Sequence, residues 1–279
     1  MRRGNPRLFV DYKRRTMARF CSLFSSSSGN STYVGSGSTG VLIDAGVSAK
    51  RLTAALTQRD IAPESLAGIF VTHSHIDHVN GIRVFASKYG TTVYGTAGTL
   101  REMEEAGILN GKFKAEVIAT DGMEIGGLFV KPFATPHDTA ESCGFTVTMP
   151  DERRAAVATD IGHMTNEIMN AIVGCDLVML ESNHDVGMLQ NGPYPYYLKR
   201  RILSPRGHLS NEACSQAAAQ LVERGTTRLF LGHLSRDNNM PQLAWQTTYA
   251  ALCEIGAQAE RDYILNVNPI ENTEDIVRF

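Results

Sequence analysis

Residues 72–78 read Thr-His-Ser-His-Ile-Asp-His, and they directly follow an apolar run, 68–71, that is expected to form a buried strand. Four potential metal ligands fall within six positions of this stretch: His73, His75, Asp77 and His78. Three imidazoles so close together would repel one another if more than one were protonated, and they bring no evident gain in packing. Neutral imidazole and carboxylate are the ligands that a borderline divalent metal prefers. The stretch therefore predicts a metal site at the end of a strand, with alternate residues directed toward two centres.

Short strands and helices alternate along the rest of the chain. The serine- and glycine-rich run 25–31 is expected to form a turn between two strands, and a helix is expected from about Asn80 to Lys88. Two patterns occur twice, a strand ending in His at 69–73 and 229–233 and a strand leading into Asp-x-Gly at 44–46 and 160–162. Together they predict a mixed-sheet architecture with two similar halves that face one another in one domain.

The His-x-His-x-Asp-His pattern after an apolar strand resembles the signature of the metallo-β-lactamase fold. The resemblance implies an α/β protein of mixed type, an αββα sandwich in a single domain, and it covers roughly residues 18–270. It also implies further ligands in three later loops, which this chain offers as His137 in FATPHDT, Asp160 in VATDIG and His233 in LFLGH.

In the family pattern the ligands divide into two sets, with one shared residue. The first metal would be held by His73, His75 and His137. The second would be held by Asp77, His78 and His233. Asp160 would bridge the two.

A closer resemblance is to the YycJ/WalJ-type branch of the fold. Short flanking motifs carry it, namely FCSLFSSSSGNSTYV at 20–34, LIDAG at 42–46, ESNHD at 181–185, GHLSN at 207–211 and GHLSRDNN at 232–239. The branch consists of bacterial cytosolic proteins, and the resemblance implies an exonuclease that acts on DNA from the 5′ end. Chains of this branch typically start near the position of Met17.

The chemistry of such a site favours phosphoester hydrolysis. Two divalent ions bring more positive charge than two aspartates remove, so the site attracts an anionic substrate. Paired ions lower the pKa of a coordinated water to about 7 and neutralise charge on both the attacking and the leaving oxygen. Asp77 is a candidate to orient that water. Imidazole and carboxylate ligands suit Zn²⁺, Mn²⁺ or iron, and lactam or thioester hydrolysis stays open.

Two further histidines occur in the branch motifs. His184 follows a predicted strand, as the ligands do, and is either a proton donor in the site or a hydrogen-bonding support behind it. His208 precedes Ser210 and Asn211, which are candidates to cap a helix whose N-terminus binds phosphate. The prediction assigns catalysis to Asp77, His184 and His208, and substrate binding to Ser210 and Asn211.

A basic cluster lies just before this motif and consists of Lys199, Arg200, Arg201 and Arg206. Charge runs usually form a solvated helix face, but beside a phosphate-binding turn Lys199 and Arg200 are candidates to contact a nucleic-acid backbone. Next to the cluster lie Tyr194, Tyr196 and Tyr197. These rings are either core aromatics or stacking partners for a terminal base.

Composition bounds the class of protein. The chain has 279 residues, 43% hydrophobic and 20% charged, and it lacks the 18 consecutive apolar residues of a membrane span. Residues 1–16 contain six basic residues and one acidic residue, whereas the remaining 21 basic and 28 acidic residues leave the rest of the chain at −7. Binding to long nucleic acid should therefore be modest and salt-sensitive. Five scattered cysteines favour reduced thiols and a cytoplasmic location.

The basic N-terminal segment lacks the apolar stretch of a secretory signal. We interpret residues 1–16 as a flexible leader, or an over-long start before Met17, ahead of a hydrolase domain at 17–279. A basic arm for an anionic partner is the alternative.

These features predict a two-metal phosphodiesterase, best explained as a DNA exonuclease without a membrane partner. The alternatives are a hydrolase of a small phosphodiester or another metabolite, and a weakly catalytic regulatory binding protein. The complete set of seven ligands argues against the regulatory protein, since a scaffold does not need them.

Overall fold

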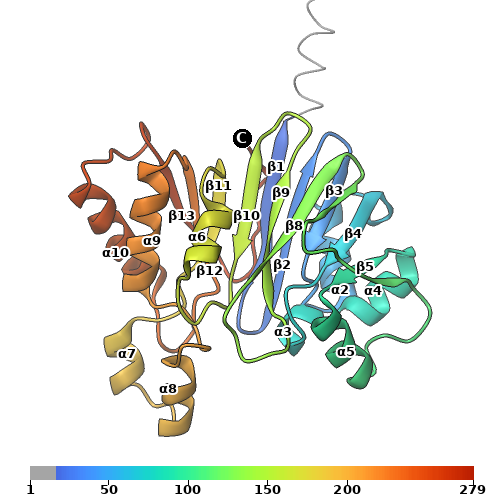
Figure 1. Cartoon of the computed structure of the whole chain (residues 1–279), viewed down its shortest axis with the longest axis horizontal. Helices are drawn as coiled ribbons and strands as arrows, with labels where there is room; N and C mark the ends of the chain where they lie inside the picture. The colour runs from blue at the N-terminus through green and yellow to red at the C-terminus, as the bar shows by residue number, and fades with distance from the viewer. Residues whose placement is uncertain (1–16) are drawn as a thin grey trace, which may run out of the picture.

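The computed structural model describes residues 17–279, so the predicted leader lies outside the described residues. Within that range two seven-stranded sheets pack face to face (Figure 1). The strands of the first are β1 (Ala18–Ser26), β2 (Gly29–Ser36), β3 (Thr39–Ile43), β4 (Leu66–Phe70), β5 (Val93–Gly95), β6 (Ala115–Val117) and β14 (Val277–Arg278). The strands of the second are β7 (Met123–Ile125), β8 (Leu128–Ala134), β9 (Cys143–Thr148), β10 (Arg154–Ala158), β11 (Leu177–Glu181), β12 (Arg228–Gly232) and β13 (Ile264–Val267).

The two sheets have matching orders, and the repeated Asp-x-Gly pattern follows the equivalent strands β3 and β10. The repeated strand-His pattern has no such match, because β4 is adjacent to β3 whereas β12 is separated from β10 by β11. The first runs β14-β1-β2-β3-β4-β5-β6 and the second β13-β12-β11-β10-β9-β8-β7. Each sheet combines antiparallel neighbours with parallel ones, such as β3 with β4 and β10 with β11. The predicted mixed architecture and single domain are confirmed.

Helices cover the outer face of each sheet (Figure 1). Beside the first sheet lie α2 (Ala49–Thr57), α3 (Ile76–Val79), the 3₁₀ turn η1 (Pro63–Ser65), α4 (Ile82–Tyr89) and α5 (Ala97–Glu105). Beside the second lie α6 (Asn166–Ile172), α9 (Asn211–Glu223) and α10 (Pro241–Glu254). Two further helices, α7 (Val186–Asn191) and α8 (Tyr196–Ile202), project below the second sheet. None of the helices between residues 17 and 279 is both long and apolar enough to cross a bilayer.

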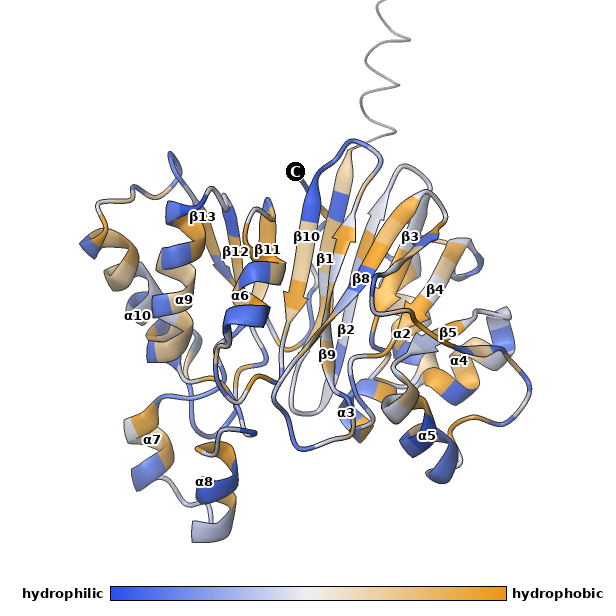
Figure 2. Ribbon diagram, viewed as in Figure 1, coloured by the Kyte–Doolittle hydropathy of each residue, from blue (hydrophilic) through white to orange (hydrophobic). Residues whose placement is uncertain are grey.

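Three hydrophobic layers hold the sandwich together. Because successive side chains of a strand point to opposite faces, Leu42 packs under the helices of the first sheet while Ile43 packs between the sheets. In β11, Val178 packs under the outer helices and Met179 packs between the sheets. Strands that are buried on both faces have continuous apolar sequences. Figure 2 shows hydrophobic residues along the central strands and hydrophilic residues in the loops below the sheets. Cys21, Cys143, Cys175 and Cys214 are buried free thiols, as small core residues would be.

One local expectation, the extent of the turn at residues 25–31, was wrong. Strands β1 and β2 extend through the serine-rich run, so only residues 27 and 28 form the turn. The polar side chains are explained by their bonds: Ser25 Oγ accepts from His233 N at 2.8 Å, and Ser31 Oγ donates to Asp44 O at 2.8 Å. The helix expected from about Asn80 to Lys88 is present as α4 (Ile82–Tyr89), and a separate short helix, α3, precedes it inside the ligand motif.

Candidate metal centre and active site

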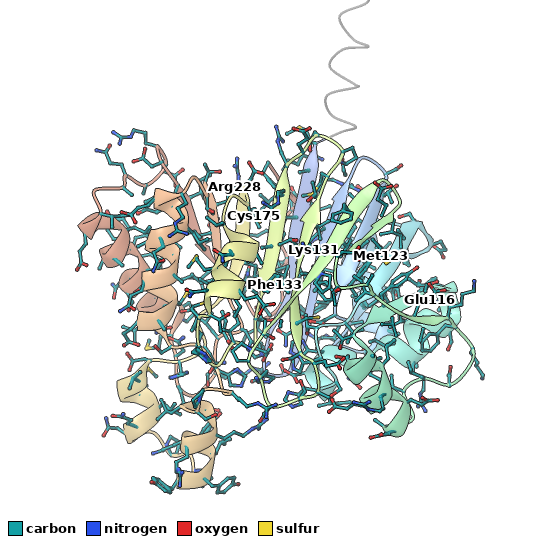
Figure 3. All side chains as sticks on the ribbon, in the orientation of Figure 1. Glu116, Met123, Lys131, Phe133, Cys175 and Arg228 are labelled. Atoms are coloured by element: carbon teal, nitrogen blue, oxygen red, sulfur yellow. The ribbon has the colours of Figure 1, made fainter. Side chains whose placement is uncertain are left out.

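The predicted ligands come from both sheets and meet in loops at one end of the sandwich. His73–His78 follow β4, His137 follows β8, Asp160 follows β10 and His233 follows β12. The carboxyl ends of parallel strands β10, β11 and β12 lie at the same edge, where the loops of an α/β sheet usually form the site. Side chains with nitrogen and oxygen atoms crowd this lower end in Figure 3.

Three imidazoles form the first ligand set. His73 Nε2 lies 3.1 Å from His75 Nδ1, and His137 Nε2 lies 3.3 Å from the same atom. Burial, together with the nearby charges of His78 and His137, holds the pKa of His73 well below its usual range. The imidazole is therefore neutral and offers a lone pair, as a metal ligand must.

Asp77, His78 and His233 form the second set, with ligand atoms within 4.8 Å of one another. Asp160 lies between the sets, because its Oδ1 is 3.8 Å from His137 Nε2 and its Oδ2 is 3.3 Å from His78 Nε2. The structure thus brings all seven predicted ligands together in one place.

Two observations show that divalent cations fit these residues. Asp160 Oδ2 and His233 Nε2 are buried, and neither has a hydrogen-bond partner among the described residues. Burial by itself lowers the pKa of His78 and His233, but nearby carboxylates outweigh it and raise the pKa of His78 to about 9 and that of His233 well above its usual value. The pocket therefore attracts positive charge, and its converging unpaired atoms suit a binuclear metal site.

We expect metal binding to release protons. At pH 7 His78 of the metal-free protein is protonated, because its pKa lies near 9, and a ligating imidazole must give up that proton. Below pH 9 the apparent metal affinity should fall by about tenfold per pH unit for each displaced proton. Titrating metal-free protein with Zn²⁺ in weak buffer should release at least one proton per chain. Stoichiometric binding without proton release would contradict this charge assignment.

Buried carboxylates hold the ligand histidines in orientation. Asp44 Oδ2 lies 2.7 Å from His78 Nδ1, and Thr72 donates to the same carboxylate through N at 2.8 Å and Oγ1 at 2.9 Å. Asn30 Nδ2 lies 3.3 Å from Asp77 Oδ2. A carboxylate behind a ligating imidazole sets its tautomer and leaves Nε2 for the metal.

Glu181 has the same role on the second sheet, and the sequence reasoning missed it. The side chain is fully buried and accepts from His233 Nδ1 at 2.9 Å, His208 Nδ1 at 2.8 Å and Ile161 N at 2.7 Å. Burial raises the pKa of a carboxylate, but the charges and hydrogen bonds of His208 and His233 hold the pKa of Glu181 well below its usual range. A carboxylate at the end of an apolar strand, as in LIDAG and ESNHD, was the available signal for both Asp44 and Glu181.

The loop after β3 approaches α3 closely at Gly46. Its N–H donates to Asn30 O at 2.8 Å, and a Cβ at this position would collide with the backbone oxygen of Asp77. Gly46→Ala should therefore displace α3, destabilise the protein by about 1–3 kcal/mol and lower the metal content. Denaturant unfolding and metal analysis test this.

A matched control is Gly187→Ala in α7, where the new Cβ would meet only the tip of Asp185 at 3.2 Å. Equal stability and metal content in both variants would show that the close approach at Gly46 does not matter.

The ligands form the floor of a cavity of about 320 Å³, near the lower limit for ligand pockets. One wall is formed by Tyr194 and by Leu198, Arg201 and Ile202 of α8. Other lining residues are Ser27, Ile76, Asp138, Asn183, Gly207, His208 and Ser235. The side chain of His208 is 19% exposed, and Arg201 Nε donates to Asp138 Oδ2 at 2.5 Å.

The other predicted catalytic and substrate-binding residues lie outside this lining. His184 is 1% exposed, and neither ring nitrogen has a hydrogen-bond partner among the described residues. Ser210 Oγ caps α9 by accepting from Ala213 N at 3.2 Å, while Asn211 is buried against Ser182 and Asn239.

The two predicted basic contacts are also engaged elsewhere. Lys199 Nζ donates to Gln190 O at 2.8 Å and to Gly192 O at 2.7 Å, which closes the loop between α7 and α8. Arg200 lies over the Tyr196 ring. Contact of either side chain with substrate stays a prediction.

The sequence matches a known protein family and several characterised proteins of that family. A family model described as the beta-lactamase superfamily domain matches residues 39–234. Exodeoxyribonuclease YycJ of Bacillus anthracis is 38% identical over 238 residues, which cover 85% of this chain and 90% of that protein. Exodeoxyribonuclease WalJ of Streptococcus pneumoniae is 34% identical over 244 residues, with coverages of 85% and 88%.

Solved structures show the same fold at low identity. The metallo-beta-lactamase fold protein YhfI from Bacillus subtilis has a TM-score of 0.70 at 14% identity, with 94% of this chain and 100% of that chain covered. Zn²⁺-bound PqqB from Methylobacterium extorquens has a TM-score of 0.67 at 17% identity, with 91% and 98% covered.

The chain therefore belongs to the metallo-β-lactamase superfamily, and it is a hydrolase that bears the ligands of a metal site. Within the superfamily it is similar to the exodeoxyribonucleases YycJ and WalJ, which confirms the predicted branch.

Proposed function

We propose that the protein is a cytoplasmic two-metal phosphodiesterase that removes nucleotides from DNA, starting at the 5′ end. The observation that carries the proposal is one small cavity that is lined by residues of both ligand sets and by His208, whose ring is bonded to the buried Glu181. The similarity to exodeoxyribonucleases supports DNA as the substrate, with Zn²⁺, Mn²⁺ or iron as the cofactor.

The chain's own residues would first hold the metals in place. His73, His75 and His137 would hold one ion, Asp77, His78 and His233 the other, and Asp160 both. When bound, the ions supply activation of water and neutralisation of phosphate charge. Asp44 and Glu181 keep the Nδ1 atoms of His78 and His233 engaged, so that Nε2 is the ring atom each histidine would offer to a metal. Asp77 is the candidate to orient the attacking water.

His208 is the group placed to give a proton to the leaving oxygen. Its Nδ1 is bonded to Glu181, so Nε2, on the other side of the ring, remains for the cavity. Glu181 Oε1 accepts from both His208 Nδ1 and His233 Nδ1, which fixes the orientation of the His208 ring. Arg201 brings a guanidinium to the same cavity for the phosphate.

The decisive experiment is hydrolysis of 5′- and 3′-labelled DNA and RNA by protein reconstituted with metal. We expect mononucleotides to be released from the 5′ end of DNA. Release from the 3′ end would overturn the polarity, and preference for RNA would overturn the substrate. If only small phosphodiesters were cleaved, the metabolite hydrolase would be correct. Full metal occupancy without hydrolysis of any phosphodiester would favour a regulatory binding protein.

A further inference from the structure

Helices α7 and α8 project below the second sheet (Figure 1), and Leu198, Arg201 and Ile202 of α8 line the metal cavity. The position of this helix pair is held at three points. Lys199 closes the loop between the helices, Arg201 pairs with Asp138 next to a ligand histidine, and Tyr194 Oη donates to Asp237 Oδ2 at 2.7 Å. Side chains on α8 therefore have a defined place relative to the metal ligands.

Two neighbouring tyrosines on α8 are not core residues. Tyr196 is 76% exposed and Tyr197 is 74% exposed. The structure thereby excludes the core role for these two rings. Two adjacent rings exposed to this degree beside a catalytic cavity indicate a contact surface.

Helix periodicity places both rings next to cationic groups. Tyr197 and Arg201 are four residues apart, so they share a face of α8, and Arg201 lines the cavity. Tyr197 therefore lies about one turn, or about 5.4 Å, further along the helix from the cavity wall. Tyr196 and Arg200 share the adjoining face, with the guanidinium 5.9 Å from the ring centroid.

The size of the cavity and the charge of the chain indicate the occupant of this surface. A cavity of about 320 Å³ is small, so nucleotides that follow the cleaved one must lie outside it, at the rim. Residues 17–279 carry a net negative charge, so they offer no broad basic field for a duplex backbone. Aromatic rings with neighbouring arginines are the means by which proteins hold unpaired bases of any sequence.

We propose that Tyr196 and Tyr197 stack on unpaired bases of the DNA strand whose terminal nucleotide enters the cavity. The substrate is then an end presented as a single strand, and the rings take the bases directly behind the scissile phosphate. This inference rests on the proposed nuclease function and adds to it the state of the strand and the residues that hold it.

The test compares wild type with Tyr196→Ala/Tyr197→Ala on DNA with a single-stranded 5′ end. Loss of stacking should raise KM by about tenfold or more, with kcat little changed, since both rings lie outside the catalytic floor. The variant Tyr196→Phe/Tyr197→Phe should restore KM because it keeps the rings. Tyr249→Ala is the matched control, because Tyr249 is a partly exposed tyrosine on α10 that stacks on Trp245.

A second arm places abasic sites at the nucleotides behind the cleaved one. Wild type and the double alanine variant should then have similar KM values, because there is no base to stack. An unchanged KM on intact DNA, or an equal loss on abasic DNA, would overturn the inference. If wild type cleaved no DNA, the nuclease function would fail instead. Equilibrium binding of a single-stranded oligonucleotide to both metal-loaded proteins would then still decide whether the tyrosines stack.

Discussion

Asp160→Asn is expected to lower turnover by about three orders of magnitude or more and to reduce the metal content below that of wild type. The carboxylate lies between the two ligand sets, and its Oδ2 is buried without a hydrogen-bond partner among the described residues. An amide removes the negative charge that both cations need. Paired metals contribute several kcal/mol of transition-state stabilisation, which sets the size of the loss.

Asparagine is preferable to alanine because of the backbone at this position. Asp160 has φ +58, and asparagine tolerates this left-handed conformation better than most residues. Asp60 offers a matched control, since it is exposed, has φ +54 and lies outside the cavity lining, so Asp60→Asn should leave turnover unchanged. Wild-type activity and metal content in Asp160→Asn would refute the bridging assignment.

His75→Ala should likewise abolish turnover while the fold is retained.

His208→Ala is expected to lower turnover by about two to four orders of magnitude on a phosphodiester with a poor leaving group. The loss should be much smaller with a good leaving group, which departs without a proton. Metal content should not change, because seven other residues form the ligand sets. Loss of an ion in His208→Ala would instead identify His208 as a metal ligand. This outcome has a structural basis, because His208 Nδ1 lies 3.5 Å from Asp160 Oδ1.

Comparison variants separate proton donation from support. Glu181→Gln should lower turnover and also weaken metal binding, since Glu181 holds both His208 and His233. His184→Ala should leave the leaving-group dependence as in wild type, because the ring is buried outside the cavity lining. A leaving-group effect confined to His184→Ala would reverse the two assignments.

The first ligand cluster was predictable because local chemistry carries it, whereas the αββα fold and the later ligands His137, Asp160 and His233 were predicted from the family resemblance. His73 to His78 form a dense cluster directly after an apolar run, and both features are visible without any tertiary contact. The phosphate role of Ser210 and Asn211 was inferred from a cap signature. The cap is present, but both residues lie outside the cavity lining, since a cap signature does not tell where its helix points. Helix α7 was missed because it is only six residues long and lies between polar turns.

By itself, the sequence determined which side chains can bind metal, their order along the chain, and the two-sheet architecture that brings strand ends together. Only the tertiary structure decided which other groups reach that site. Glu181 contacts residues 27 and 52 positions away, and Asp44 contacts one 34 positions away, so neither pairing is visible in a local pattern. Whether a side chain is buried also depends on tertiary packing. His184 is buried in the interior, whereas Tyr196 and Tyr197 are exposed on α8.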